Sequence, residues 1–433
     1  MAERRASWAE PARHPRSSAE VRTRRLAARW LIPVEGPAIE YGALLIGPNG
    51  RILDVGSDSS VPRPEGVPAE IFDDAVIVPG LINTHTHLEL TGFDGRISEL
   101  DFTTWIRQLR ELKSTRSPAE YLEAARLGVA QCFAAGVTTV ADTGDSGAVI
   151  RALVEAAGAG VAYQEVFGPH PDQLGESLHG LQVRVAELRE IATDRARVGV
   201  SPHAPYTVSG PLFRAVAELA RREQLPIAVH TAESLAESEL VRQGTGPFAQ
   251  AWRGRGIPLP WPCGQTPVSW LAEHGVLSPE TLCIHAVQLD LGDVDELADS
   301  GASIAHCPLS NRAHGHGDAP LAELLARGIR VGLGTDSVVS VGQLDLLAEA
   351  RAAGSLVPSL SADDLIELCT LGGARALGLE PQTGSLRAGK WADCAVIRVP
   401  VRGPGTPAGR VLASGPNDVL RTYVGGKEVY RSL

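Results

Sequence analysis

The sequence predicts an α/β protein whose main part is a distorted TIM (β/α)8 barrel. From Pro79 to Leu379, short apolar segments alternate with amphipathic segments of helical period, as in repeated βα units around a parallel sheet. Eight such apolar segments occur, and eight parallel strands are the number that closes into this kind of barrel. We expect the strands to begin at Val76, Val137, Gly160, Ala196, Pro226, Thr281, Ala302 and Ile329.

The two ends of the chain predict a second, smaller domain. Residues 25–78 alternate apolar and polar side chains around a Pro-Asn-Gly turn, and residues 380–433 return to the same alternation. We expect these segments to pair into a small β-sandwich beside the barrel, which would then span residues 79–379. Residues 1–24 are rich in Arg, Ala and Ser and lack the apolar core of a secretory signal, so we expect a disordered tail, with an Arg-rich targeting segment as the alternative.

Composition and charge disfavour several classes of partner. The 433-residue chain has a net charge of −11, whereas nucleic acids and anionic membranes attract basic proteins. No apolar run reaches the roughly 18 residues that a membrane-spanning helix needs. The six cysteines include no CxxC pair, which is typical of buried thiols in a reducing compartment. We therefore expect a cytoplasmic protein whose partner is a small molecule, with no nucleic acid and no membrane.

Polar side chains end the predicted strands at one side of the barrel. In a (β/α)8 barrel, the carboxyl ends of the strands carry the functional groups. A single histidine at a strand end is more often a packed or hydrogen-bonded side chain, but this gathering of histidines and acids is hard to explain by independent placement. The residues concerned are His85, His87, Asp142, Glu165, His203, His230, His285, His306 and Asp336.

His85 and His87 stand two residues apart at the end of the first barrel strand. Residues i and i+2 of a strand share a face, so both imidazoles can point into the barrel mouth and bind one ion. A divalent metal with a position left for water needs about one more histidine and a carboxylate, which His230 and Asp336 can supply. The expected cofactor is one divalent ion, Zn²⁺ first, with Fe²⁺ or Mn²⁺ as alternatives.

Six motifs resemble those of the amidohydrolase superfamily, in the branch of cytosine, guanine and adenosine-type nucleoside deaminases. They are PGLINTHTHLE at 79–89, HAPYTVS at 203–209, HTAES at 230–234, HAV from 285, HCPLSN at 306–311 and GTDS at 334–337. The resemblance implies the same barrel with an appended β-sandwich, in agreement with the pattern above. The terminal segment GSLRAGKWADCAVI is similar to the β-sandwich return of that family.

Lysine usage separates branches of the superfamily that this sequence resembles. Its binuclear members bridge two metals with a carboxylated lysine on the fourth strand. This chain has only Lys113, Lys390 and Lys427, all outside the predicted barrel strands. One metal is therefore expected, and His203 occupies the end of the fourth strand.

The resemblance also implies roles for the other residues at the strand ends. Glu233 would be the acid that protonates a ring nitrogen of an amino-heterocycle before ammonia leaves, although it could instead cap a helix starting near Ser234. His285 would orient the attacking water, and Asp336 would both bind the metal and accept the proton of that water. The expected substrate-binding residues are His203, Glu89, Trp105, Ser310 and Asn311, for which packing or turn formation is the alternative.

These expectations combine into a function. A mononuclear hydrolytic deaminase of a 6-aminopurine nucleoside, of the adenosine, methylthioadenosine, adenosylhomocysteine or aminodeoxyfutalosine type, fits the motifs best. The alternatives are a related hydrolase of another C–N or C–Cl bond, such as an imidazolonepropionase-like or s-triazine hydrolase-like enzyme, and a barrel without catalysis, which the retained ligands oppose.

His314 and His316 lie in a glycine-broken loop and are not expected to bind metal. Residues 244–267 are expected to form a lid or a subunit contact, which leaves a homo-oligomer open.

Overall fold

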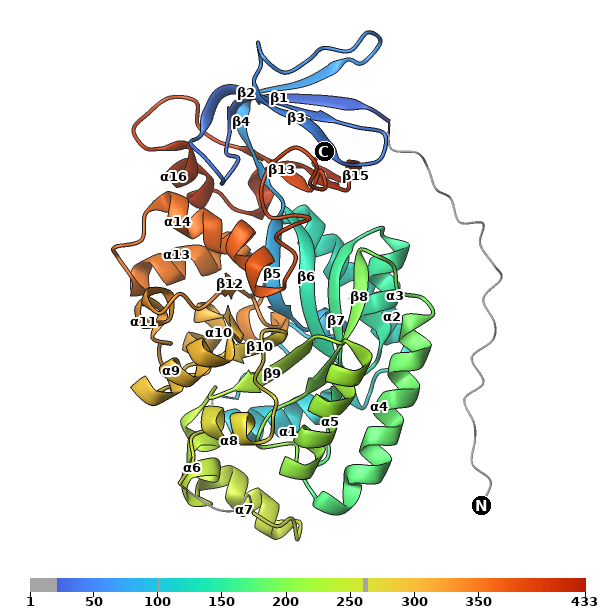
Figure 1. The fold of residues 1–433 in the computed structure, drawn as a ribbon, viewed down its shortest axis with the longest axis vertical. Helices are drawn as coiled ribbons and strands as arrows, with labels where there is room; N and C mark the ends of the chain where they lie inside the picture. The colour runs from blue at the N-terminus through green and yellow to red at the C-terminus, as the bar shows by residue number, and fades with distance from the viewer. Residues whose placement is uncertain (1–21, 100, 260–263) are drawn as a thin grey trace.

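The computed structural model of the chain describes residues 22–99, 101–259 and 264–433. Figure 1 shows two parts, a barrel surrounded by helices and a separate sheet that packs against one end of it. Within the described ranges, no helix combines the length and the apolar character that crossing a membrane requires.

The barrel confirms the predicted fold class. Its eight parallel strands follow one another in chain order around the sheet, and each of the eight predicted strands is present. A parallel bridge between Thr86 and Asp336 joins the two edge strands, and the amide of Asp336 donates to the His85 carbonyl at 3.0 Å. The strands are β5 (Leu81–Thr86), β6 (Val137–Gly144), β7 (Ala159–Val166), β8 (Ala196–Pro202), β9 (Ile227–Thr231), β10 (Thr281–His285), β11 (Ser303–His306) and β12 (Val331–Leu333).

Helices surround the barrel, as Figure 1 shows for α4 and α5, and the buried residues of these two helices are apolar. The helix α2 begins at Pro118, and the Ser117 and Glu120 side chains form a capping box at its start. The helices are α1 (Phe102–Lys113), α2 (Pro118–Ala134), α3 (Ala148–Glu155), α4 (Leu174–Arg189), α5 (Gly210–Glu223), α6 (Leu235–Gln243), α7 (Gly246–Gly254), α8 (Pro267–Glu273), α9 (Leu291–Ser300), α10 (Pro308–Ala313), α11 (Leu321–Ala326), α12 (Val338–Val341), α13 (Leu346–Leu356), α14 (Ala362–Glu367), α15 (Gly373–Ala376) and α16 (Pro407–Leu412).

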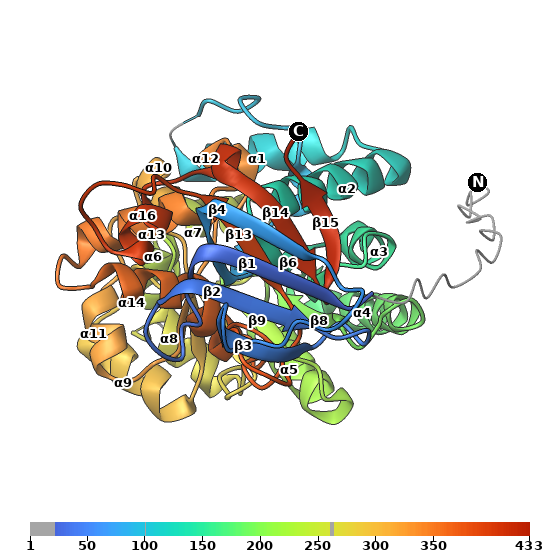
Figure 2. The same cartoon turned by 90° about the horizontal axis from the view of Figure 1, so that it is seen from above.

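The two ends of the chain pair into one mixed sheet, as the sequence predicts. Seven strands form a single hydrogen-bonded order, β15-β14-β13-β4-β1-β2-β3, visible from above in Figure 2. The N-terminal and C-terminal parts meet where β4 runs antiparallel to β13. The strands are β1 (Arg24–Leu31), β2 (Ile39–Ile46), β3 (Ile52–Ser57), β4 (Ala69–Pro79), β13 (Cys394–Arg398), β14 (Val419–Val424) and β15 (Lys427–Arg431).

The boundary between the two parts differs from the prediction. The apolar run from Val76 to Ile82 was expected to be one barrel strand, but β4 ends at Pro79 in the outer sheet and β5 begins at Leu81 in the barrel. Gly80 joins them where a β-carbon would lie 2.1 Å from the Thr138 Oγ1 atom, so only glycine fits this crossing. Residues 1–21 of the expected tail lie outside the described residues. The tail was expected to extend to residue 24, but β1 begins at Arg24.

Candidate metal centre and active site

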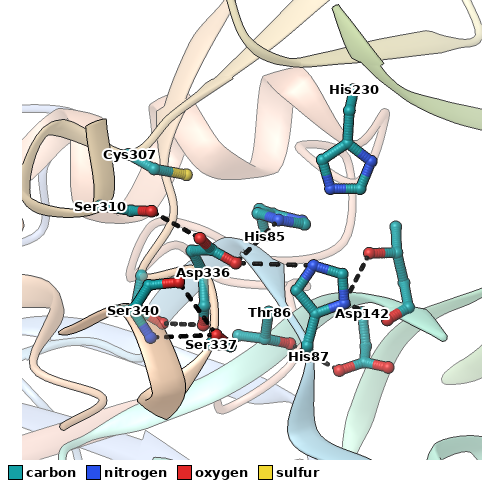
Figure 3. A network of polar contacts seen from close by, with 12 residues as sticks. His85, Thr86, His87, Asp142, His230, Cys307, Ser310, Asp336, Ser337 and Ser340 are labelled. Carbon is teal, nitrogen blue, oxygen red and sulfur yellow. Dashed lines mark hydrogen bonds and ion pairs between the residues drawn. The ribbon is translucent and has the colours of Figure 1, made fainter. Parts of the chain in front are cut away.

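Three histidine side chains converge at the carboxyl end of the barrel. His85 and His87 lie at the end of β5, and His230 lies on β9 across the barrel mouth (Figure 3). The His85 ring centroid is 4.8 Å from that of His87 and 5.0 Å from that of His230. One nitrogen of each ring lies within 4.8 Å of the others, which is close enough for all three to bind a single ion.

Asp336 completes this group from the opposite edge of the sheet, just after β12. Its Oδ1 atom lies 3.5 Å from the Nε2 atoms of both His85 and His87. Ser310 donates to the other carboxylate oxygen at 2.5 Å and fixes the orientation of the group. Asp336 has φ of +59°, a left-handed conformation that costs a non-glycine residue energy and is concentrated at functional sites.

The donor atoms of this group fit a divalent metal. The His87 Nδ1–H donates to the Thr143 carbonyl at 2.8 Å, and the His230 Nδ1–H donates to the His203 carbonyl at 3.1 Å. These bonds leave the Nε2 lone pair of each ring free for a metal, as in known histidine sites. Both His85 ring nitrogens are buried without a hydrogen-bond partner among the described residues. Burial lowers the pKa of His85 to about 4, so its imidazole is neutral, which is the form that binds metal.

Glu233 is buried next to this group, with 4% of its surface exposed. Its Oε1 atom lies 3.5 Å from the His285 Nε2 atom and 3.4 Å from the His316 Nε2 atom. Tyr206 donates its hydroxyl proton to Oε2 at 3.1 Å. Burial alone would raise the pKa of Glu233, but the two imidazoles lower it to about 2, so the side chain is a carboxylate before substrate binds.

The alternative role of Glu233 as a helix cap does not apply. Ser234 is the N-cap of α6, and its hydroxyl accepts from the Glu237 amide. The Glu237 carboxylate in turn accepts from the amides of Ala232 and Glu233 at 2.8 and 2.9 Å. These two bonds hold the turn after β9, so Glu233 remains available to the cavity.

His285 lies at the end of β10 with its Nε2 atom directed at Glu233. Its Nδ1–H donates to the Asn311 Oδ1 atom at 2.9 Å, which leaves a lone pair on Nε2. The backbone of His285 is left-handed, with φ of +71°, as at Asp336. Asn311 lies on α10, and its hydrogen bond therefore fixes the orientation of the His285 ring relative to this helix.

A cavity of about 500 Å³ opens above the metal centre. The side chains of His87, His230 and Asp336 form its base together with Glu233 and His285. Aromatic and aliphatic side chains of the segment after β5, of α1 and of the loops after β7 and β8 form much of its wall. They are Leu90, Phe102, Trp105, Ile106, Leu109, Phe167 and Tyr206.

The structure divides the five residues expected to bind substrate into two groups. His203 and Trp105 line the cavity. Ser310 and Asn311 lie behind its wall, where they orient Asp336 and His285. Glu89 is also buried, with 1% of its surface exposed, and its carboxylate forms an ion pair with Lys113 at 3.0 Å. These three residues are placed to position other side chains instead of contacting a ligand.

Further polar side chains without a role assigned from the sequence lie at or beside the cavity. Tyr206 and His316 contact Glu233, while Lys113 and Glu165 line the wall away from it. His316 stands in the glycine-broken loop that was not expected to bind metal, and its contact is with the carboxylate. Tyr206 follows His203 in the motif HAPYTVS, which was the available signal. The expected lid at residues 244–267 contains α7, and residues 260–263 of it lie outside the described residues.

The fold and the histidine-rich centre define a metal-dependent (β/α)8 hydrolase, and comparison with known proteins identifies the family. The sequence pattern of the Amidohydrolase family matches residues 76–429. The chain therefore belongs to the amidohydrolase family, whose enzymes of this type act on carbon–nitrogen bonds.

Similar proteins cover almost the whole chain. The 5′-deoxyadenosine deaminase of Methanothermobacter thermautotrophicus is 31% identical over 417 residues, 92% of this chain and 91% of that protein. The 5-methylthioadenosine/S-adenosylhomocysteine deaminase of Desulfitobacterium hafniense is 32% identical over 418 residues, 93% and 92% of the two chains. The crystal structure of an adenosine deaminase from Xanthomonas campestris with bound zinc has a TM-score of 0.80 at 23% identity, over 94% of this chain and 92% of that one.

Proposed function

We propose that this protein is a hydrolytic deaminase that releases ammonia from a 6-aminopurine nucleoside, with one divalent ion, Zn²⁺ in the first instance, as cofactor. The observation that carries the proposal is the position of Glu233. Its carboxylate lies at the base of the cavity, next to His285 and beside the three histidines and the aspartate of the metal centre. Hydrolysis of an aromatic C–N bond needs a proton carrier in this position, because the ring nitrogen beside the attacked carbon must be protonated.

The ion would be held by His85, His87, His230 and Asp336, and it would supply the Lewis acidity that makes water nucleophilic near neutral pH. Asp336 accepts a proton from the attacking water through the carboxylate that Ser310 holds in place. His285 accepts a hydrogen bond from the same water through Nε2, because Nδ1 donates to Asn311. Glu233 starts as a carboxylate, takes up a proton from the solvent and delivers it to the ring nitrogen. The proton held by Asp336 passes to the amino group, which leaves as ammonia, and the proton of the new 6-hydroxyl group returns to Glu233.

The named activities of the relatives support the substrate class. The two relatives named above, at 31% and 32% identity, are deaminases of adenosine derivatives that differ at the 5′ position. The cavity in this chain is large enough for a nucleoside, and its aromatic wall suits a purine ring. At this level of identity, we assign the 6-aminopurine nucleoside as the substrate and leave the 5′ group open.

The proposal is tested by ammonia release from the metal-loaded protein. The protein is stripped with a chelator, reloaded with Zn²⁺, Fe²⁺ or Mn²⁺, and incubated with adenosine, 5′-deoxyadenosine, methylthioadenosine, adenosylhomocysteine and aminodeoxyfutalosine. We expect ammonia and the matching 6-oxopurine product from at least one of these, and loss of activity after chelation. Turnover of imidazolonepropionate or a chloro-s-triazine without turnover of any purine nucleoside would overturn the proposal.

A further inference from the structure

The wall of the cavity on the side of β7 contains a buried carboxyl group with no role in the mechanism above. Glu165 lies next to the last residue of β7 and lines the cavity, with 6% of its surface exposed. Its Oε1 atom is buried and has no hydrogen-bond partner among the described residues. A buried polar group left in this state is energetically unfavourable, so a partner from outside the chain is expected to occupy it.

The neighbours of Glu165 are already occupied by other groups. The His203 Nε2 atom is 3.9 Å from Oε1, beyond hydrogen-bond distance, and the other ring nitrogen faces the Thr207 hydroxyl at 2.8 Å. The ammonium group of Lys113 lies 3.0 Å from Glu89 and 2.8 Å from Asp145, so its charge is balanced by these two acids. No described side chain is therefore left to satisfy Glu165.

Glu165 lies near the metal centre, next to two histidines at the cavity. A carboxyl oxygen of Glu165, a nitrogen of His203 and a nitrogen of His230 all lie within 4.8 Å of one another. Glu233 and His285 lie on the other side of the barrel mouth, after β9 and β10. The cavity continues from Glu165 outward to Leu109, Lys113 and Tyr121 of α1 and α2. A substrate held at the metal centre would thus extend past Glu165.

The charges around Glu165 restrict the chemistry of the group that it binds. An anionic group would face the carboxyls of Asp145 and Glu165. A neutral group with two hydrogen-bond donors avoids this conflict and matches a carboxyl group, which presents two oxygens side by side. Vicinal hydroxyls provide this arrangement.

From these contacts we infer that Glu165 is a specificity-determining residue that binds the 2′- and 3′-hydroxyls of the substrate ribose. The inference rests on the proposed function for the identity of the substrate, and it adds a residue that selects ribonucleosides over nucleosides lacking these hydroxyls. Glu165 touches the sugar and takes no part in the proton transfers at the purine ring.

The experiment compares adenosine with 2′,3′-dideoxyadenosine in the Zn²⁺-loaded wild-type, Glu165→Ala and Glu165→Gln proteins. Gln164→Ala is the matched control, because Gln164 is the adjacent residue of β7 and faces away from the cavity toward the Asp145 carbonyl. We measure kcat and KM for ammonia release, and the Kd of both nucleosides from quenching of tryptophan fluorescence in the metal-free protein.

The expected result is a wild-type preference for adenosine of about tenfold or more, in kcat/KM and in Kd, that falls to near one in Glu165→Ala. The loss should arise through KM for adenosine, with values for the dideoxynucleoside unchanged and with Gln164→Ala like the wild type. Glu165→Gln should keep part of the preference, because the amide retains one acceptor oxygen.

The outcomes separate the inference from the proposed function. Deamination without a preference, or a preference that survives in Glu165→Ala, overturns the inference and leaves the proposed function standing. Binding with a Glu165-dependent preference but without ammonia release from any purine nucleoside supports the inference and overturns the proposed function. An equal loss of affinity for both nucleosides in Glu165→Ala would show a structural role and would also overturn the inference, and absence of binding and turnover overturns both.

Discussion

At the two halves of the barrel mouth, the side chains with proposed catalytic roles and the side chain of Glu165 are held in different ways. On the side of β9 to β12, Glu233 contacts Tyr206, His285 contacts Asn311 and Asp336 contacts Ser310, each at hydrogen-bond distance. On the side of β6 to β8, Glu165 has a buried oxygen without a partner. The first half resembles a preorganised catalytic site. The second resembles a binding surface on which a ligand would supply the missing hydrogen-bond partner. The variants below test this division, beginning with the largest expected effect.

Asp336→Asn should abolish the reaction most completely. The amide lacks the charge that binds the ion and the basicity that accepts a proton, so we expect loss of bound metal and a fall in kcat/KM on the order of 10³-fold or more. Elemental analysis and ammonia release measure the two effects. Asp318→Asn, at an exposed position, is the control. Normal metal content with a full rate would remove Asp336 from both roles.

Glu233→Gln should retain the metal and lose the rate. Gln has the same shape but cannot carry a proton, and proton carriers of this kind contribute roughly 10²- to 10⁴-fold. We therefore expect a decrease in kcat of that order at unchanged metal content. Glu218→Gln, exposed on α5, controls for removal of a carboxylate. A kcat within a few-fold of the wild type would assign the proton transfer to another group.

Asn311→Ala tests whether His285 depends on support from α10. Without the acceptor, the Nδ1–H of His285 loses its partner and the ring loses its fixed tautomer. Loss of such a partner lowers activity by about 10- to 100-fold, so we expect a fall of this size in kcat. Asn311→Asp provides an acceptor again and should recover most of the kcat. An unchanged kcat in Asn311→Ala would mean that packing alone orients His285.

Lys113→Met should affect stability more than catalysis. Glu89 is almost completely buried and would lose the ammonium group 3.0 Å away, and an unpaired buried charge of this kind costs about 3–5 kcal/mol. We expect a lower midpoint of urea unfolding, with kcat changed by only a few-fold.

The double variant Glu89→Gln/Lys113→Met should recover much of this loss, since the buried carboxylate is then removed and only the exposed carboxylate of Asp145 loses its partner. Lys427→Met, at an exposed position of β15, is the control. Wild-type stability in Lys113→Met would show that solvent compensates the carboxylate of Glu89.

The sequence was sufficient for the barrel and for the metal centre because both follow from short-range patterns. Two histidines separated by one residue share a strand face, and strand ends of a parallel barrel meet at one rim. The contacts of Glu89 and Asn311 could not be predicted in this way. Glu89 meets Lys113 because the direction of α1 brings the two residues together across 24 positions of the chain, and Asn311 meets His285 through the turn from β11 into α10. Such directions are set by packing between elements.

The crossing at Gly80 gives the C-terminal segment an influence on the chemistry. The strand β5, which leads into His85 and His87, is joined through Gly80 to the preceding strand β4. One edge of β4 pairs with β13 at residues 394–398. During synthesis on the ribosome, that edge stays uncovered until every strand of the barrel has emerged. A protein shortened before residue 394 would therefore keep all of its metal-binding residues and still lack the support that holds the first two of them in place.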